Sequence, residues 1–343
     1  MIFDRNINIK ESFNAIVGTG GIGTGSIYRL EGNHDLGRNE SRMGHLLAVK
    51  DFCKLHIILH YIAVLIKDLK INTEIYPIGA VGDDPAAGEL FHMMKDSGMN
   101  MKFVRTMENT PTLHSICYQY PDSSGGNITE NQSASSKVSS QMMADAEAIL
   151  CQNKSIVITA PEVPLSSRIA LIKLGAKNHA CVLASFVPDE IEHIINGSLL
   201  KKIDILSVNL DEAAALGNVS VKASTETIVH NCIKSTSRIN PQIKLCITCG
   251  SNGLVGYDKG EVTHLSALNV AVKNTAGAGD AVLSGIITGL VLGLPFISDD
   301  APSCVKLGRL ISAMSVISPD TINFDMNLQS LLHFQKMHKE TIL

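Results

Sequence analysis

Short apolar segments alternate with helical ones between residues 139 and 248. The apolar segments have the length of buried strands: 155–159, 181–184, 203–209 and 243–248. The intervening segments have helical spacing: 139–150, 165–174, 189–196, 212–216 and 224–235. Apolar strands separated by helices are typical of a mostly parallel sheet that is covered on both faces. The pattern predicts an α/β fold in which ligands bind beyond the carboxyl ends of the strands.

The remaining apolar segments extend this sheet and its helices. We expect strands at 13–17 and 73–81, an extended segment at 269–272, and helices at 86–97 and 281–292. The segment 41–69 predicts two helical pieces, of which the second covers 55–69. A chain of 343 residues with 45% hydrophobic content is long enough for one large α/β unit. We therefore expect a single catalytic domain over residues 1–343.

A β-like region interrupts the helices between residues 102 and 137. Its strand-like pieces are 102–105, 113–120 and 128–129, with the polar turn 121–127 between the last two. This arrangement predicts a hairpin that leaves the main sheet. Together with residues 18–40 it is expected to form a small β lid over the site.

A glycine turn stands between the segment 269–272 and the helix 281–292. The turn reads Asn274-Thr-Ala-Gly-Ala-Gly-Asp280 and ends on an acid in the first helical turn. Free backbone N–H groups and the helix dipole make such a turn an anion-binding site. Asp280 can then take a proton from a hydroxyl that attacks a phosphoryl group, or it can simply cap the helix.

Composition argues against several other classes of protein. The 29 basic and 33 acidic residues give a net charge of −4 and form no basic block, so we expect neither a nucleic-acid nor a membrane partner. The apolar run 281–294 is too short to span a bilayer, and the first residues have no signal-peptide core. The eight scattered cysteines fit reduced thiols, and we expect a cytoplasmic protein.

Three further motifs have weaker functional interpretations. Gly18-Thr-Gly-Gly-Ile-Gly23 matches the dinucleotide fingerprint, but the polar, glycine-broken segment after it lacks the required helix. Cys246-Ile-Thr-Cys249 lies in a predicted strand and has no second pair with which to bind zinc. His56 and His60 lie four residues apart on a helix, where a metal site is less expected than core or substrate-facing side chains.

With these strand ends in view, the chain resembles the ribokinase-like (PfkB) family of carbohydrate kinases over nearly its full length. Residues 274–280 resemble the family's D-T-x-G-A-G-D signature, and Asn209-Leu-Asp-Glu212 is similar to its N-x-x-E motif. Thr248-Cys-Gly-Ser-Asn-Gly253 looks like the T-x-G-x-x-G strand end. Val81-Gly-Asp-Asp84 with Gly88, and Pro111-Thr112, match two motifs near the lid.

The resemblance implies a ribokinase-like three-layer sandwich and a role for each matching residue. Asp280 would be the general base, and Gly277, Ala278, Gly279 and Asp280 would form the anion hole. ATP would be bound by Asn209, Glu212, Thr248, Gly250, Gly253 and Thr275. Glu212 would hold Mg²⁺ through water, and residues 304–311 would line the adenine side. Phosphoryl transfer depends mainly on such positioning and charge stabilisation.

The chain departs from the family at the positions that normally read the substrate. Asn274 replaces the usual Asp and Ala276 a common Thr, near positions where some members bind K⁺, so K⁺ activation is not implied. Residues 20–23 lack the Asn and Asp that hold sugar hydroxyls, and residues 54–60 lack the Gly-Gly of the first signature. Residues that would contact substrate instead are Gly21, Gly23, Arg38, Asn39, Arg42, His56 and His60.

The sequence thus predicts an ATP-dependent kinase that phosphorylates a hydroxyl of a sugar or a similar small molecule. Two alternatives stay open: a nucleoside kinase of the adenosine or pseudouridine type, and a catalytically silent kinase-like module that binds a metabolite. A lid hairpin over 113–129 leaves one face exposed unless another copy covers it, which predicts a homodimer.

Overall fold

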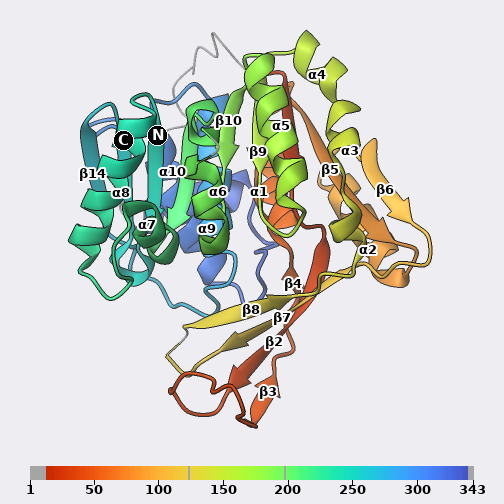
Figure 1. Cartoon of the computed structure of the whole chain (residues 1–343), viewed down its shortest axis with the longest axis vertical. Coiled ribbons are helices and arrows are strands. Elements are labelled where there is room, and N and C mark those ends of the chain that lie inside the picture. The colour runs from red at the N-terminus through yellow and green to blue at the C-terminus, as the bar shows by residue number, and fades with distance from the viewer. Residues whose placement is uncertain (1–12, 123, 197, 339–343) are drawn as a thin grey trace.

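The computed structural model describes residues 13–122, 124–196 and 198–338 and contains two sheets (Figure 1). In these residues nine strands form the main sheet, in the order β14-β13-β12-β11-β10-β9-β1-β5-β6. Seven strands, from β12 to β6, run parallel, and β13 and β14 add an antiparallel edge. The bounds are β1 Ala15–Thr19, β5 Glu74–Gly82, β6 Phe103–Met107, β9 Ser155–Thr159, β10 Cys181–Ala184, β11 Ile205–Asn209, β12 Lys244–Thr248, β13 Leu254–Asp258 and β14 Glu261–Leu265.

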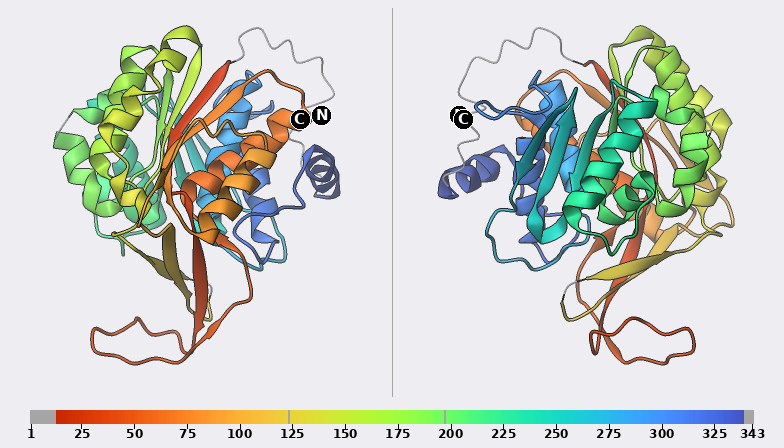
Figure 2. Two further views of the ribbon diagram at one scale, coloured as in Figure 1. Left: turned by 90° about the vertical axis from the view of Figure 1, so that its right-hand side faces the viewer. Right: turned by 60° about the vertical axis from the view of Figure 1, so that its left-hand side comes forward.

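Helices cover both faces of this sheet, which makes the fold a three-layer, ribokinase-like α/β sandwich (Figure 2). One face packs on α1 Lys54–Asp68, α2 Pro85–Asp96, α9 Ala278–Val291, α10 Cys304–Val316 and α11 Leu328–Met337. The other packs on α3 Ser140–Ala144, α4 Glu147–Gln152, α5 Leu165–Lys177, α6 Ile191–Asn196, α7 Leu210–Gly217 and α8 Thr225–Ile239. In β1, Ile16 joins the first core cluster and Val17 the second, because successive side chains of a strand point to opposite faces.

The smaller sheet projects from the carboxyl edge of the main sheet and forms the lid (Figure 1). Its strands are β2 Gly23–Leu30, β3 Gly44–Leu46, β4 Asp51–Phe52, β7 Leu113–Gln119 and β8 Gly125–Thr129. β7 and β8 form the expected antiparallel hairpin, and β7 also pairs in parallel with β2. β2 follows the glycine turn directly, so a strand stands where a dinucleotide fingerprint requires a helix.

Two sequence predictions about these elements are wrong. The first helical piece expected within 41–69 is instead β3 and β4, two short lid strands held by pairing to β2. The residues around Phe103 do not leave the main sheet; they form its edge strand β6, parallel to β5. The lid strands β2, β7 and β8 lie within the expected ranges 18–40 and 102–137, and β3 and β4 lie outside them. Residues 269–272, expected as an extended segment, belong to neither a helix nor a strand.

Two expectations made from composition can be compared with the described residues. In that part of the chain, no helix combines the length and the apolarity that crossing a bilayer requires. All eight cysteines are free thiols, and Cys246 and Cys249 are buried at the end of β12.

Candidate active site

Asp280 lies in the first turn of α9, directly after the glycine turn. Gly277 caps the helix with φ of 78°, in the left-handed region that glycine adopts without strain. A Cβ on Gly277 would come within 3.1 Å of Thr321 O, whereas one on Gly279 would meet nothing within 4 Å. Gly279 therefore borders open space above the helix end. The Ala278 amide donates to Thr275 O at 3.2 Å, so one of the amides expected in the anion hole is engaged within the turn.

Lys54, the first residue of α1, faces Asp280. Its Nζ atom lies 3.8 Å from Asp280 Oδ2, and the two side chains are 36% and 14% exposed. The Asp280 carboxylate is the main cause that raises the pKa of Lys54, so this amino group is charged at neutral pH. Burial raises the pKa of Asp280, and the Lys54 ammonium opposes that rise. The Lys54 ammonium thus favours the ionised form of Asp280, whereas burial opposes it.

Glu162 is a second acid beside Lys54 that the sequence analysis missed. It follows β9 in a left-handed conformation with φ of 75°, and its Oε2 atom accepts the Lys54 backbone N–H at 2.9 Å. A Cβ on Gly21 would lie 2.3 Å from that oxygen, so the glycine makes room for the carboxyl group. Burial raises the pKa of Glu162 to about 7, although Lys54 opposes the shift. An acid directly beyond an apolar strand was the available signal in the sequence.

Asn209 and Glu212 form a capping box at the start of α7. Asn209 Oδ1 accepts the Glu212 N–H at 2.9 Å, and Glu212 Oε2 accepts the Asn209 N–H at 2.8 Å. Burial raises the pKa of Glu212 to about 7. The carboxyl group thus sits in a fixed position where a nearby cation would favour its charged form.

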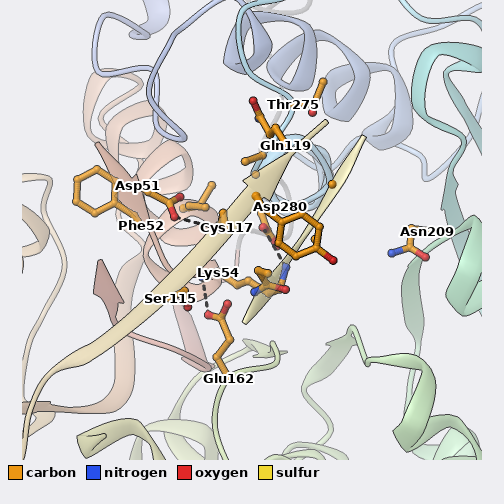
Figure 3. Close-up of a pocket in the computed structure, with 17 residues that line it drawn as sticks. Asp51, Phe52, Lys54, Ser115, Cys117, Gln119, Glu162, Asn209, Thr275 and Asp280 are labelled. Atoms are coloured by element: carbon orange, nitrogen blue, oxygen red, sulfur yellow. Dashed lines mark hydrogen bonds and ion pairs between the residues drawn. The ribbon is translucent and has the colours of Figure 1, made fainter. Parts of the chain in front are cut away.

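Two neighbouring clefts meet at Asp280. The larger, with a volume of about 360 Å³, lies under the lid and is lined by Asp51, Ser115, Cys117, Gln119, Asn127 and Glu162, among others (Figure 3). The smaller, of about 210 Å³, is lined by Glu212, Thr248, Ala278 and Gly279, among others. Both clefts include Lys54, Asn209, Thr275, Gly277 and Asp280. The carboxyl group of Asp280 can therefore reach a molecule in either one.

The structure brings together most of the residues expected to bind the nucleotide, with exceptions. Thr248 lines the smaller cleft with residues 277–280, but Gly250 and Gly253 line neither cleft. They shape the turn after β12, with φ of 57° and 91°. Residues 304–311, expected on the adenine side, form the first half of α10 and are almost all buried against α9 and the sheet.

The expected substrate residues do not line the larger cleft, and this part of the prediction is corrected. His56 and His60 are buried in an aromatic cluster with Phe52 and Phe324, because α1 turns this face toward the core. Arg38 and Asn39 are exposed in the loop between β2 and β3. In the same loop, Arg42 donates to Glu40 Oε1 at 2.6 Å and to a backbone carbonyl.

The two expected substrate glycines lie below the cleft rather than in its lining. Gly21 leaves space for Glu162, and Gly23 leaves space for Leu113 of β7, whose carbonyl oxygen would be 2.2 Å from a Cβ. Lid residues that do line the cleft include Ser115, Cys117 and Gln119 of β7, besides Asp51, Phe52, Tyr118 and Asn127. Ser115, Cys117 and Gln119 alternate along β7, and their spacing of two residues was readable once the strand was known to cover the site.

Asn274 is fully hydrogen-bonded within the protein. Its Nδ2 atom donates to Pro319 O at 2.9 Å, and its Oδ1 atom accepts from Gln119 Nε2 at 2.9 Å and from the Ala276 amide at 3.0 Å. These two hydrogen bonds use both lone pairs of the Oδ1 atom, which leaves none for a cation. This side chain therefore does not fit a monovalent-cation site.

The mostly parallel sheet with helices on both faces and the projecting β lid define a ribokinase-like fold. Solved structures share the fold: Giardia lamblia ribokinase (TM-score 0.75, 16% identity, covering 93% of this chain and 99% of that one) and Arabidopsis thaliana ribokinase with ribose and ATP (TM-score 0.72, 21% identity, covering 94% and 99%).

Sequence comparison identifies the family. The profile of the pfkB family carbohydrate kinases matches residues 62–327, so the chain belongs to that family. Arabidopsis thaliana ribokinase is 24% identical over 255 residues, which are 71% of this chain and 66% of that protein. The chain thus aligns with slightly less than two thirds of that relative.

Proposed function

We propose that the protein transfers the γ-phosphoryl group of ATP to a hydroxyl group of a sugar or sugar-like small molecule. The observation that carries this proposal is the position of Asp280 at the junction of the two clefts. An acceptor in the larger cleft and a triphosphate in the smaller one would meet at this carboxylate. Membership of a carbohydrate kinase family supports the same reaction.

Each group at the junction has a part in the transfer. Asp280 accepts the proton of the attacking hydroxyl, and burial, which raises its pKa, makes it a stronger base. Lys54 and the amides at the start of α9 stabilise negative charge on the phosphoryl oxygens. The hydroxyl oxygen forms the new P–O bond while the bond to ADP breaks, and the nucleotide leaves through the smaller cleft.

The acids of the smaller cleft fit a magnesium ion held through water. Glu212 is half-buried, its carboxyl group is fixed by Asn209, and its raised pKa reflects a charge without full compensation. Mg²⁺ bound with ATP neutralises phosphate charge during transfer. Glu212 would orient the ion's water shell, and Thr248 would border the phosphates.

The test is Asp280→Asn, compared with Glu31→Gln on the exposed rim of the lid. Loss of the base should lower kcat by about 10²–10⁴-fold, with ATP affinity nearly unchanged. Turnover is measured as ADP release over a panel of sugars, sugar phosphates and nucleosides. Near-native turnover by Asp280→Asn would reject the role of the base. Failure of the native protein to consume ATP with every compound would favour the silent metabolite-binding module.

We also propose a homodimer formed through the outer face of the lid. Four apolar side chains are exposed there: Tyr28, Leu46, Ile116 and Ile128. Ile116 lies opposite Ile128, and Tyr28 opposite Leu46, so the four form two cross-strand pairs. A paired apolar face of this kind is typical of an interface. Light scattering should give a dimer that Ile128→Glu dissociates; a native monomer at all concentrations would exclude it.

A further inference from the structure

Acidic groups outnumber basic ones around the larger cleft. Of its described lining residues, three carry carboxyl groups, namely Asp51, Glu162 and Asp280, and only Lys54 carries a cation. A cavity lined in this way repels phosphate and carboxylate groups, since like charges at short range in a low-dielectric site interact strongly. The acceptor in this cleft is therefore not expected to be anionic.

The Lys54 ammonium group lies on the Asp280 side of the larger cleft. It lies 3.8 Å from Asp280, and this carboxylate is the largest cause of the raised pKa of Lys54. Lys54 also lines the smaller cleft, where the phosphates are proposed to bind. Figure 3 shows Lys54 between Asp280 and Glu162. A triphosphate in the smaller cleft would attract this ammonium group. Less of its charge would then neutralise Glu162 and Asp51.

Asp51 is held at the cleft by the lid. Its side chain is buried, with 6% of the residue exposed, and its Oδ2 atom accepts the Cys117 thiol at 3.3 Å. A Cβ on Gly25 would lie 2.0 Å from the same oxygen, so the glycine of β2 leaves the space that this carboxyl group occupies. Burial raises the pKa of Asp51, whereas Cys117 lowers it only in part. The carboxyl group is thus fixed in place at the edge of the cleft.

Asp51 and Glu162 act on the same space. Both carboxyl groups line the larger cleft, and the Asp51 charge adds to the rise in the pKa of Glu162 that burial mainly causes. Both line the cleft onto which the base Asp280 opens, and that cleft is where the acceptor must bind. A cation bound by Asp51 and Glu162 would relieve the repulsion and favour the ionised form of each carboxyl group.

We propose that the acceptor is a polyol carrying an ammonium group, without phosphate or carboxylate, and that Asp51 and Glu162 bind the ammonium group. This inference rests on the proposed kinase activity. An ammonium group has three N–H donors, enough for both carboxylates at once. Ser115 and Asn127 supply hydrogen-bonding groups for the hydroxyls, and Phe52 closes one wall.

The first experiment compares matched acceptors with the native protein. ADP release is measured with glucose, glucosamine, N-acetylglucosamine and glucosamine 6-phosphate, and with fructose and 1-amino-1-deoxyfructose. The ammonium compounds should exceed their hydroxyl analogues by about tenfold or more in kcat/KM. Acetylation or phosphorylation should abolish the advantage. Equal or better use of the neutral or phosphorylated compounds would overturn the proposal while leaving the kinase activity intact.

The second experiment separates binding from turnover. Calorimetric binding of each pair is measured with Asp280→Asn, which keeps Asp51 and Glu162, so a preference for ammonium is observable without catalysis. Glu162→Gln and Asp51→Asn should each reduce that preference by about tenfold, whereas Glu31→Gln should retain it. Folding of each variant is checked by thermal unfolding. Failure of every ammonium polyol to bind, or a preference unchanged in folded Glu162→Gln, would contradict the proposal.

Discussion

Gln119 Nε2 donates a hydrogen bond to Asn274 Oδ1 at 2.9 Å, and this bond joins the lid to the glycine turn. Gln119 is the last residue of β7, and Asn274 is the first residue of the glycine turn, three residues before the helix cap Gly277. Both are buried, so the bond is shielded from water. This bond thereby fixes the position of the lid relative to the glycine turn.

Replacing Gln119 by Leu should impair acceptor binding more than protein stability. The substitution removes a buried hydrogen bond worth about 1–2 kcal/mol, so KM for the acceptor should rise roughly tenfold. Asn274 keeps its bonds to Ala276 and Pro319, so the turn itself should survive. Steady-state kinetics and thermal unfolding measure the two effects. An unchanged KM would show that this bond does not stabilise the closed lid.

Turnover should not depend on potassium. Both polar atoms of the Asn274 side chain form hydrogen bonds within the protein, and its Nδ2 atom donates to the Pro319 carbonyl oxygen. Replacing K⁺ by tetramethylammonium at constant ionic strength should leave kcat and KM unchanged. Asn274→Asp, which exchanges the amide N–H donors for a charge, is the matched variant in which dependence on K⁺ is tested. Strong K⁺ activation of the native protein would contradict this interpretation of Asn274.

Lys54→Met should slow catalysis and shift its pH dependence. Burial raises the pKa of Asp280 and the Lys54 ammonium lowers it, so loss of the ammonium raises this pKa further. The acidic limb of kcat/KM should therefore move to higher pH, and kcat should fall by about 100-fold. Lys54→Arg keeps the charge and should keep the position of the limb. A limb that stays in place in Lys54→Met would remove Lys54 from the control of Asp280.

His56 should destabilise the fold as the pH falls. Burial, aided by His60, lowers the pKa of His56 to about 3, whereas an imidazole in the unfolded chain has a pKa of about 6.5. The unfolded chain therefore binds the proton first, and stability is lost below that higher pKa. At about pH 5 the loss is about 2 kcal/mol, which His56→Leu should eliminate.

Denaturant unfolding of native protein and His56→Leu at about pH 8 and pH 5 measures this difference. The exposed His230 provides the control, since His230→Leu should leave the pH dependence of the unfolding free energy as in the native protein. If His56→Leu loses as much stability on acidification as the native protein, His56 does not govern it.

The interior of the sheet was predictable because its strands are apolar on both faces. The predicted bounds of β9 and β10 agree with the structure, and each has only buried or partly buried residues. The short strands β3 and β4 lack any such pattern, and they exist only through pairing with β2. β6 is an edge strand with exposed polar residues, so its sequence resembles a lid strand.

The candidate site likewise has a part that the sequence predicted and a part that it did not. The turn around Asp280 was predictable because its glycines, acid and helix are contiguous in the sequence. Lys54 and Glu162 were not, because each acquires its role from residues far away in the chain. The expected histidines failed for a related reason: α1 is buried on nearly all sides, so its sequence does not reveal which face borders the cleft.

The short connection between the lid and α1 has a consequence for the timing of the reaction. Cys53 alone separates Phe52, the end of β4, from Lys54. A lid that lifts from the cleft must therefore rotate the backbone at Cys53 or draw the ammonium group away from Asp280. We expect the open protein to bind ATP without the ammonium group beside Asp280. Hydrolysis of ATP by water should therefore stay slow until binding of an acceptor closes the lid.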